Sequence, residues 1–270
     1  MPHSKPYRNF QEASRATLTH TTADEPITLI LSKKGWIRSR VGHGLDLSQT
    51  AFKEGDGLKQ VLEGRSVWPV VVLDSLGRTY TLDAAEIPGG RGDGVPVGSL
   101  VELQNGAEVA AMISGLPEQH YLLSNSGGYG FIAKLADMVG RVKAGKVMIS
   151  LEAGEKVLPP QAVFTVSLIN PDCKVVLASS ANRLLAFALG ELKVMAKGRG
   201  LQLMNLGEDE KLAHIAVVST PEFMVESVGK RGAARCERLR IQDIENKRGR
   251  KGRLLEISGR LKAIGGTDAE

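Results

Sequence analysis

Residues 120–131 read His120-Tyr-Leu-Leu-Ser-Asn-Ser-Gly-Gly-Tyr-Gly-Phe131, an apolar run, a small polar turn with glycine, and a second run. Glycine and asparagine adopt positive φ at little steric cost, so a turn of this composition joins two antiparallel strands. The pattern occurs five times, with its turn at positions 35, 77, 127, 181 and 232, which are 42, 50, 54 and 51 residues apart. Alanine stands at position 181, and we expect Asn182 beside it to take the left-handed conformation.

A second glycine follows each turn by 17 to 22 residues, at Gly57, Gly94, Gly145, Gly200 and Gly252. Further apolar runs bring each repeat to about four strands in ~50 residues, which is typical of a propeller blade. One such sheet cannot bury both its faces, so we expect the repeats to pack radially. The sequence therefore predicts an all-β domain over residues 27–264, a propeller-like ring of five four-stranded antiparallel blades. Residues 1–26 are interpreted as a linker or the stub of a preceding domain, and 265–270 as a disordered tail.

Composition narrows the functional classes. Of 270 residues, 42% are hydrophobic, enough for a core, and no apolar run approaches the ~18 residues of a membrane span. The first residues lack the apolar stretch of a signal peptide, which favours the cytoplasm. Two cysteines 63 residues apart and five scattered histidines support neither a disulfide framework nor a metal site. Few aromatic residues argue against a binder of single strands.

The net charge of +5 is unevenly distributed. Residues 229–262 hold twelve Lys and Arg against four Asp and Glu, a local charge of +8, so the rest of the chain sums to 5 − 8 = −3. A field of this size is typical of a protein that binds a polyanion.

No enzyme motif is complete. Gly140-Arg-Val-Lys-Ala-Gly-Lys146 has the skeleton of a phosphate-binding P-loop, but Val147 stands where the motif needs a Mg²⁺-binding hydroxyl. The G-x-S-x-G elbow is absent from the sequence, and no nucleophile, base and orienting group come together. We therefore expect a chain that is not an enzyme on its own and holds no cofactor or metal.

The segments before the last two of these glycines mix cations with glycine: Val194-Met-Ala-Lys-Gly-Arg-Gly200 and Asn246-Lys-Arg-Gly-Arg-Lys-Gly252. Such loops let the backbone approach a phosphate and add charge-assisted hydrogen bonds, which predicts binding without base recognition. From charge and loop position the candidate phosphate contacts are Arg38, Arg40, Lys197, Arg199, Lys230, Arg231, Lys247, Arg248, Arg250, Lys251 and Arg253.

Over residues 25–264 the repeats resemble the C-terminal β-pinwheel of bacterial type IIA topoisomerase A subunits. The resemblance rests on residues 25–43, 119–131 and 228–232, and it is stronger to topoisomerase IV than to gyrase. Gyrase A subunits carry a Q-R-R-G-G-K-G box in the first blade. Here that position, 51–57, has lost the box, and the segment most like it is 246–252.

The resemblance implies a DNA-binding accessory domain. It would hold a double-stranded segment along a basic outer edge, bend or position it for transport, and favour positive supercoils and linked daughter chromosomes. The cleaving tyrosine and the ATP- and Mg²⁺-dependent chemistry would lie outside this chain. Further partners would be the remaining domains of the topoisomerase IV A subunit, the B subunit, and an SMC-type chromosome-organising protein, in a nucleoid-associated enzyme. The alternatives are a platform that docks an acidic chromosome-organising protein, and an enzyme with its site in the central channel.

Overall fold

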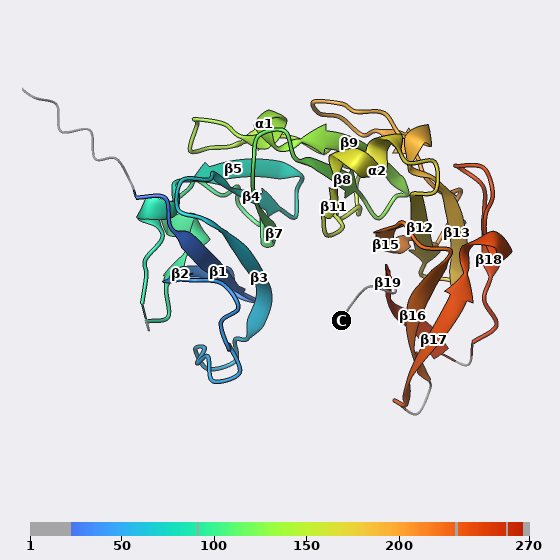
Figure 1. Ribbon diagram of the computed structural model, residues 1–270, viewed down its shortest axis with the longest axis horizontal. Coiled ribbons are helices and arrows are strands. Elements are labelled where there is room, and N and C mark those ends of the chain that lie inside the picture. Colours follow the sequence, from blue (N-terminus) through green and yellow to red (C-terminus); the bar gives the residue numbers. More distant parts are fainter. Residues whose placement is uncertain (1–22, 91, 230–231, 258, 267–270) are drawn as a thin grey trace, which may run out of the picture.

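The computed structural model describes residues 23–90, 92–229, 232–257 and 259–266. These residues form five antiparallel sheets, here called blades 1 to 5 in chain order, which follow one another along an open arc (Figure 1). Blades 1 and 5 lie at the two ends of the arc. The predicted all-β, five-bladed pinwheel is confirmed, and its ring is open.

Each blade is built around a hairpin. The inner strand pairs with the first hairpin strand, and in blades 1 to 4 a two-residue outer strand pairs with the second. In the order inner, first, second and outer strand, blade 1 consists of β3 (Leu58–Arg65), β1 (Pro26–Ser32), β2 (Trp36–Val41) and β6 (Val95–Pro96), and blade 2 of β7 (Val109–Ser114), β4 (Val70–Asp74), β5 (Arg78–Leu82) and β10 (Lys146–Val147). Blade 3 consists of β11 (Gln161–Val163), β8 (His120–Ser124), β9 (Tyr129–Lys134) and β14 (Leu201–Gln202), and blade 4 of β15 (Leu212–Val218), β12 (Lys174–Ser179), β13 (Arg183–Ala188) and β18 (Arg253–Leu254). Blade 5 consists of the inner strand β19 (Gly259–Gly266), the first strand β16 (Glu222–Gly229) and the second strand β17 (Ala234–Arg240).

Short helices occupy the connections between strands. They are η1 (Ala84–Glu86), η2 (Val97–Ser99), α1 (Leu135–Met138), α2 (Thr165–Ile169), η3 (Leu189–Glu191) and η4 (Ile241–Asp243). The first strand among the described residues, β1, starts at Pro26, and β19 includes Gly265 and Gly266, which the sequence places in the tail. The expected linker up to residue 22 and the tail from 267 lie outside the described residues.

The outer strand of a blade comes from the following repeat. β6, for example, follows β4 and β5 in the chain but pairs with β2 of blade 1. A repeat therefore supplies three strands to its own blade and one to the blade before it, where the sequence predicts four strands in a single sheet. Blade 5 consequently has three strands in the described part of the chain, not four, and its β17 is exposed at six of seven residues.

Glycine allows each repeat to supply the outer strand of the preceding blade, an arrangement that we call the strand handover. Gly94, Gly145, Gly200 and Gly252 each precede an outer strand and have φ of +85°, +63°, +85° and +77°. A Cβ at any of them would lie 2.2–2.6 Å from a carbonyl oxygen of the second strand of the preceding blade. Gly57 lacks both features and precedes the inner strand β3, so the expected equivalence of the segment 51–57 with the other four is wrong.

The core lies between blades. Each of its four apolar clusters joins side chains of two neighbouring sheets, as Leu29 with Tyr80, Val71 with Phe131, Leu122 with Phe187 and Val176 with Phe223. All eight of these side chains are fully buried. Because these clusters join neighbouring blades, an open arc can be held together without contact between its two ends.

Candidate nucleic-acid interface

Four segments run along the outer edge of the arc, because each leads into the outer strand of a blade. We call them straps 1 to 4, residues 88–94, 139–145, 194–200 and 246–252; Arg91 of strap 1 lies outside the described residues. Their charges are +1 − 1 = 0, +2, +2 and +4, so positive charge increases toward the C-terminal blades. In Figure 1, β18 lies on the convex side of the arc, whereas β11, β15 and β19 lie on the concave side.

The backbone of strap 4 is held firmly. Gly249 N–H donates to Leu203 O at 2.8 Å, Asn205 N–H donates to Arg250 O at 3.1 Å, and Asn246 N–H donates to Ala186 O at 2.9 Å. These three hydrogen bonds use only main-chain groups of the strap and engage none of its side chains. A fixed backbone with glycines at φ +77° can approach a phosphate closely.

The side chains of strap 4 divide into two groups. The side chains of Lys247, Arg250 and Lys251 are exposed and have no hydrogen-bond or ion-pair partner among the described residues. Arg248 is half-buried and donates from Nη1 to the carbonyl oxygen of Gln202. Arg253, just beyond the strap in β18, is exposed and donates to Asp243 O at 3.0 Å. Strap 4 therefore presents three unpaired cations.

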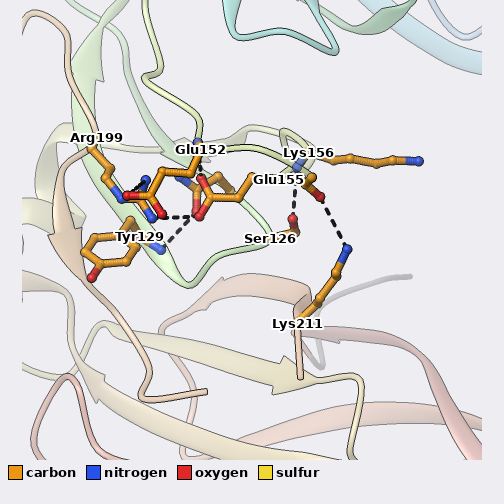
Figure 2. Close-up of polar contacts among 9 residues, drawn as sticks. Ser126, Tyr129, Glu152, Glu155, Lys156, Arg199 and Lys211 are labelled. Carbon is orange, nitrogen blue, oxygen red and sulfur yellow. Dashed lines mark hydrogen bonds and ion pairs between the residues drawn. The ribbon is translucent and has the colours of Figure 1, made fainter. Parts of the chain in front are cut away.

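Strap 3 carries two of the predicted residues, which differ in their surroundings. Lys197 is exposed and unpaired among the described residues. The guanidinium of Arg199 lies 2.7 Å from Glu152 and 2.7 Å from Glu155, and it stacks over the Tyr129 ring at 4.2 Å (Figure 2). Arg199, predicted from the sequence as a phosphate contact, is thus already paired with two carboxylates.

The burial of Arg38 contradicts the prediction that its side chain contacts a phosphate. Arg38 is 3% exposed in β2, and its guanidinium donates to the carbonyl oxygens of Gly92 at 2.6 Å and Ala51 at 2.7 Å. Burial, followed by the charge of Arg40, lowers the pKa of Arg38. Arg38 therefore joins strap 1 to the 51–57 segment from inside and is inaccessible to a phosphate. Arg40 is half-buried, and Lys230 and Arg231 lie outside the described residues.

Sequence reasoning missed two cations in strap 2. Arg141 and Lys143 are exposed, and their side chains are unpaired among the described residues. They stand before Gly145 as the predicted cations stand before Gly200 and Gly252. The segment 139–145 precedes one of the repeated glycines, but candidate phosphate contacts were selected only from the later segments 194–200 and 246–252 and from other positions.

Two further features of the described residues concern metal and small-molecule sites. No group of three or more acidic, histidine or cysteine side chains in this part of the chain could hold a metal ion. A cavity of about 570 Å³ between blades 4 and 5 is lined by charged residues. Two of these residues, Lys174 and Glu245, form an ion pair with each other at 2.6 Å. Among these residues no helix is long and apolar enough to cross a membrane.

Comparison with known proteins decides the family. A family model described as DNA gyrase C-terminal domain, beta-propeller, matches residues 174–219. The solved structure of the E. coli ParC C-terminal domain superimposes with a TM-score of 0.78 at 32% identity, covering 89% of this chain and 98% of that one. The chain belongs to the family of topoisomerase IV ParC C-terminal domains.

Full-length relatives of this family are longer. The A subunit of DNA topoisomerase 4 from Neisseria gonorrhoeae is 66% identical over 258 residues, which are 94% of this chain and 33% of the relative. Its counterpart from Escherichia coli K12 is 32% identical over 266 residues, 96% of this chain and 34% of the relative. The chain thus spans about a third of the curated relatives it matches. A DNA gyrase A C-terminal domain shares the fold, with a TM-score of 0.62 at 20% identity, covering 89% of this chain and 82% of that one.

Within this topoisomerase IV domain, straps 3 and 4 differ because equivalent glutamates have different partners. As a result, Arg199 of strap 3 is paired with carboxylates and Lys251 of strap 4 is not. Glu155-Lys156 over blade 3 and Glu210-Lys211 over blade 4 occupy equivalent turns before β11 and β15. Glu210 accepts a hydrogen bond from Ser179 and lies 3.6 Å from Arg183, both of blade 4 itself. It is therefore engaged within its own blade, and Lys251, the counterpart of Arg199, has no carboxylate partner among the described residues.

Proposed function

We propose that this chain is the non-catalytic domain of a topoisomerase IV that binds double-stranded DNA along its outer edge without reading the base sequence. One observation carries the proposal: six exposed cations, unpaired among the described residues, lie on straps of that edge, Arg141, Lys143, Lys197, Lys247, Arg250 and Lys251. Cations on glycine-containing loops suit phosphate oxygens, and nothing in their arrangement recognises a base edge.

A curved row of cations fits a bent duplex better than a straight one. The straps follow the convex side of the arc, so a duplex that contacts straps 2 to 4 would have to bend around it. We infer that the domain holds and orients the DNA segment to be transported, and so influences whether the enzyme acts on positive supercoils or on linked chromosomes.

The remaining chemistry is assigned to the rest of the enzyme. We propose that DNA cleavage by a tyrosine, the use of ATP and Mg²⁺, and contact with the B subunit of the enzyme belong to parts outside this chain, in a cytoplasmic, nucleoid-associated complex. This domain would need no cofactor to bind DNA.

The test is the salt dependence of duplex binding. Six neutralised phosphates predict a slope of log K against log salt of about −5, measurable by fluorescence anisotropy with a 30-base-pair duplex. Changing Lys247, Arg250 and Lys251 to Gln should weaken binding and reduce the slope by about 2.7.

A matched variant removes the same charge elsewhere. Lys33, Lys134 and Lys262 are exposed lysines outside the straps, and changing all three to Gln should leave the slope almost unchanged. Equal losses in the two triple variants would show that net charge, and not the outer edge, governs binding, and would contradict the proposal.

A second function is favoured by the open edge of β17. Its exposed residues include Arg235, Arg238 and Arg240, although Arg238 and Arg240 lie 3.6 Å and 3.1 Å from Glu222 and Asp243. An acidic segment of a chromosome-organising protein could pair with this edge. Competition distinguishes the two functions: a partner on β17 should bind without displacing duplex DNA from straps 2 to 4.

A further inference from the structure

The guanidinium group of Arg199 joins strap 3 to the turn before β11. Arg199 precedes the close-packed Gly200, and its Nη1 and Nη2 lie 2.7 Å from Glu152 Oε1 and Glu155 Oε1, respectively. Figure 2 shows both carboxylates converging on Arg199 while the Tyr129 ring lies against it. The cation is thus fixed on the outer edge but faces acids instead of solvent.

The two acids differ in how firmly they are held. Glu155 is 11% exposed, its second oxygen accepts the Glu152 N–H at 2.8 Å, and its carboxylate lies against Gly127 of the blade 3 turn. The Glu152 side chain is 73% exposed, and among the described residues its carboxylate pairs with Arg199 alone. Glu155 is therefore part of the packed structure, whereas Glu152 can exchange with another anion.

An exposed ion pair such as Arg199–Glu152 is weak and screened by salt. A duplex phosphate also carries negative charge and oxygens that accept charge-assisted hydrogen bonds, so it can replace the Glu152 carboxylate at Nη1 while Glu155 stays at Nη2. Stacking on Tyr129 holds the Arg199 side chain in place during the exchange. The position on strap 3 is the one that Lys251 occupies on strap 4.

We propose that the Glu152 carboxylate competes with DNA phosphate for the guanidinium of Arg199. While Glu152 is bound there, Arg199 does not contact the duplex, and Glu152 thereby limits the number of phosphates that strap 3 binds. The proposal rests on the proposed duplex binding and adds to it a residue that limits contact at blade 3. In blade 4 the glutamate equivalent to Glu155 is engaged by Arg183, and Lys251 is left open to phosphate. Contact with DNA is therefore strongest at strap 4 and is restrained at strap 3.

The test uses Glu152→Gln in the whole chain, with Glu208→Gln as its matched control. Glu208 is exposed in the equivalent turn of blade 4, and no cation partner is recorded for it among the described residues. With a 30-base-pair duplex, E152Q should bind more tightly than wild type and steepen the salt slope by about 0.9, which enlarges its advantage about 3.5-fold between 200 and 50 mM salt. E208Q should change the slope little.

Arg199→Gln completes a double-mutant cycle. In the wild-type background R199Q should change the slope little, since Glu152 already occupies Arg199. In E152Q/R199Q the gained affinity should disappear. A gain that persists in the double variant, or an equal gain in E208Q, would mean that Glu152 acts only through net charge and would overturn the inference. Wild-type protein that fails to bind the duplex at all would instead overturn the proposed function.

Discussion

The side-chain amide of Asn182 donates a hydrogen bond to the carbonyl oxygen of Gly259, 2.8 Å away. Its Oδ1 accepts the Leu261 N–H at 3.0 Å, so one side chain pairs with two backbone groups of β19. Asn182 lies in the hairpin turn of blade 4 with φ of 59°, the one positive φ at a non-glycine residue in the described chain. The same residue therefore forms a turn in blade 4 and fastens the last strand of blade 5.

Asn182→Gly should separate these two roles. Glycine keeps the positive φ but loses both side-chain hydrogen bonds, so the free energy of unfolding should fall by about 1–3 kcal/mol. Asn182→Ala should cost about 1 kcal/mol more, because alanine is strained at this φ. Urea unfolding measures both, and an N182G variant as stable as wild type would exclude a fastening role.

Gly200→Ala should damage the strand handover at blade 3. An added Cβ would lie 2.2 Å from Gly130 O, at a φ of +85° that alanine rarely adopts. We expect a loss of about 2–4 kcal/mol from strain and overpacking, or failure to fold. Gly190→Ala is the control: it has open space around its Cβ position and should change stability by less than about 1 kcal/mol.

Arg38→Gln should act on stability and not on DNA binding. The substitution leaves the carbonyl oxygens of Ala51 and Gly92 without their charged donor, which should cost about 2–4 kcal/mol. The salt slope of duplex binding should be unaffected. Arg250→Gln should do the reverse, with stability within about 0.5 kcal/mol of wild type and a slope reduced by about 0.9. Thermal unfolding and anisotropy on the same samples distinguish the two roles.

His214 should make stability depend on pH. Burial, only partly opposed by a hydrogen bond to Leu261 O, lowers the pKa of this histidine in the folded chain. The unfolded chain then binds the proton first, so the free energy of unfolding should fall as pH drops from 7 through about 6.5, the ordinary pKa of histidine. His214→Gln should flatten this dependence, and urea unfolding at pH 7.0 and 5.5 that gives the same drop in both proteins would contradict the prediction.

The sequence predicted the number of blades because turn chemistry is local. Glycine or asparagine between apolar runs is enough to place a hairpin, and Asn182 took the left-handed conformation expected beside Ala181. The strand handover was not predictable in this way. Two residues such as Arg253 and Leu254 carry too little pattern to reveal which sheet they join, and the pairing depends on a carbonyl contact with a glycine far away in sequence.

The candidate interface was predicted in part for a similar reason. Charge and loop position identify Lys247, Arg250 and Lys251, which the fold leaves free among the described residues, but they do not reveal neutralising partners. Glu152 and Glu155 are more than 40 residues from Arg199 in sequence and meet it only because two connections cross over blade 3. Arg38 is buried by a segment, 51–57, whose place in the fold the glycine pattern misassigned.

The handover of outer strands also determines where the chain can be cut. A truncation after residue 219, at the end of the fourth sequence repeat, would remove β18 and strip blade 4 of its edge, whereas one after residue 254 would keep four complete sheets. A repeat transplanted from a homologue would likewise need to carry the two residues of the next outer strand with it. The segment of chain that can be added or deleted as a unit is thus offset by one strand from the segment that makes up one visible sheet.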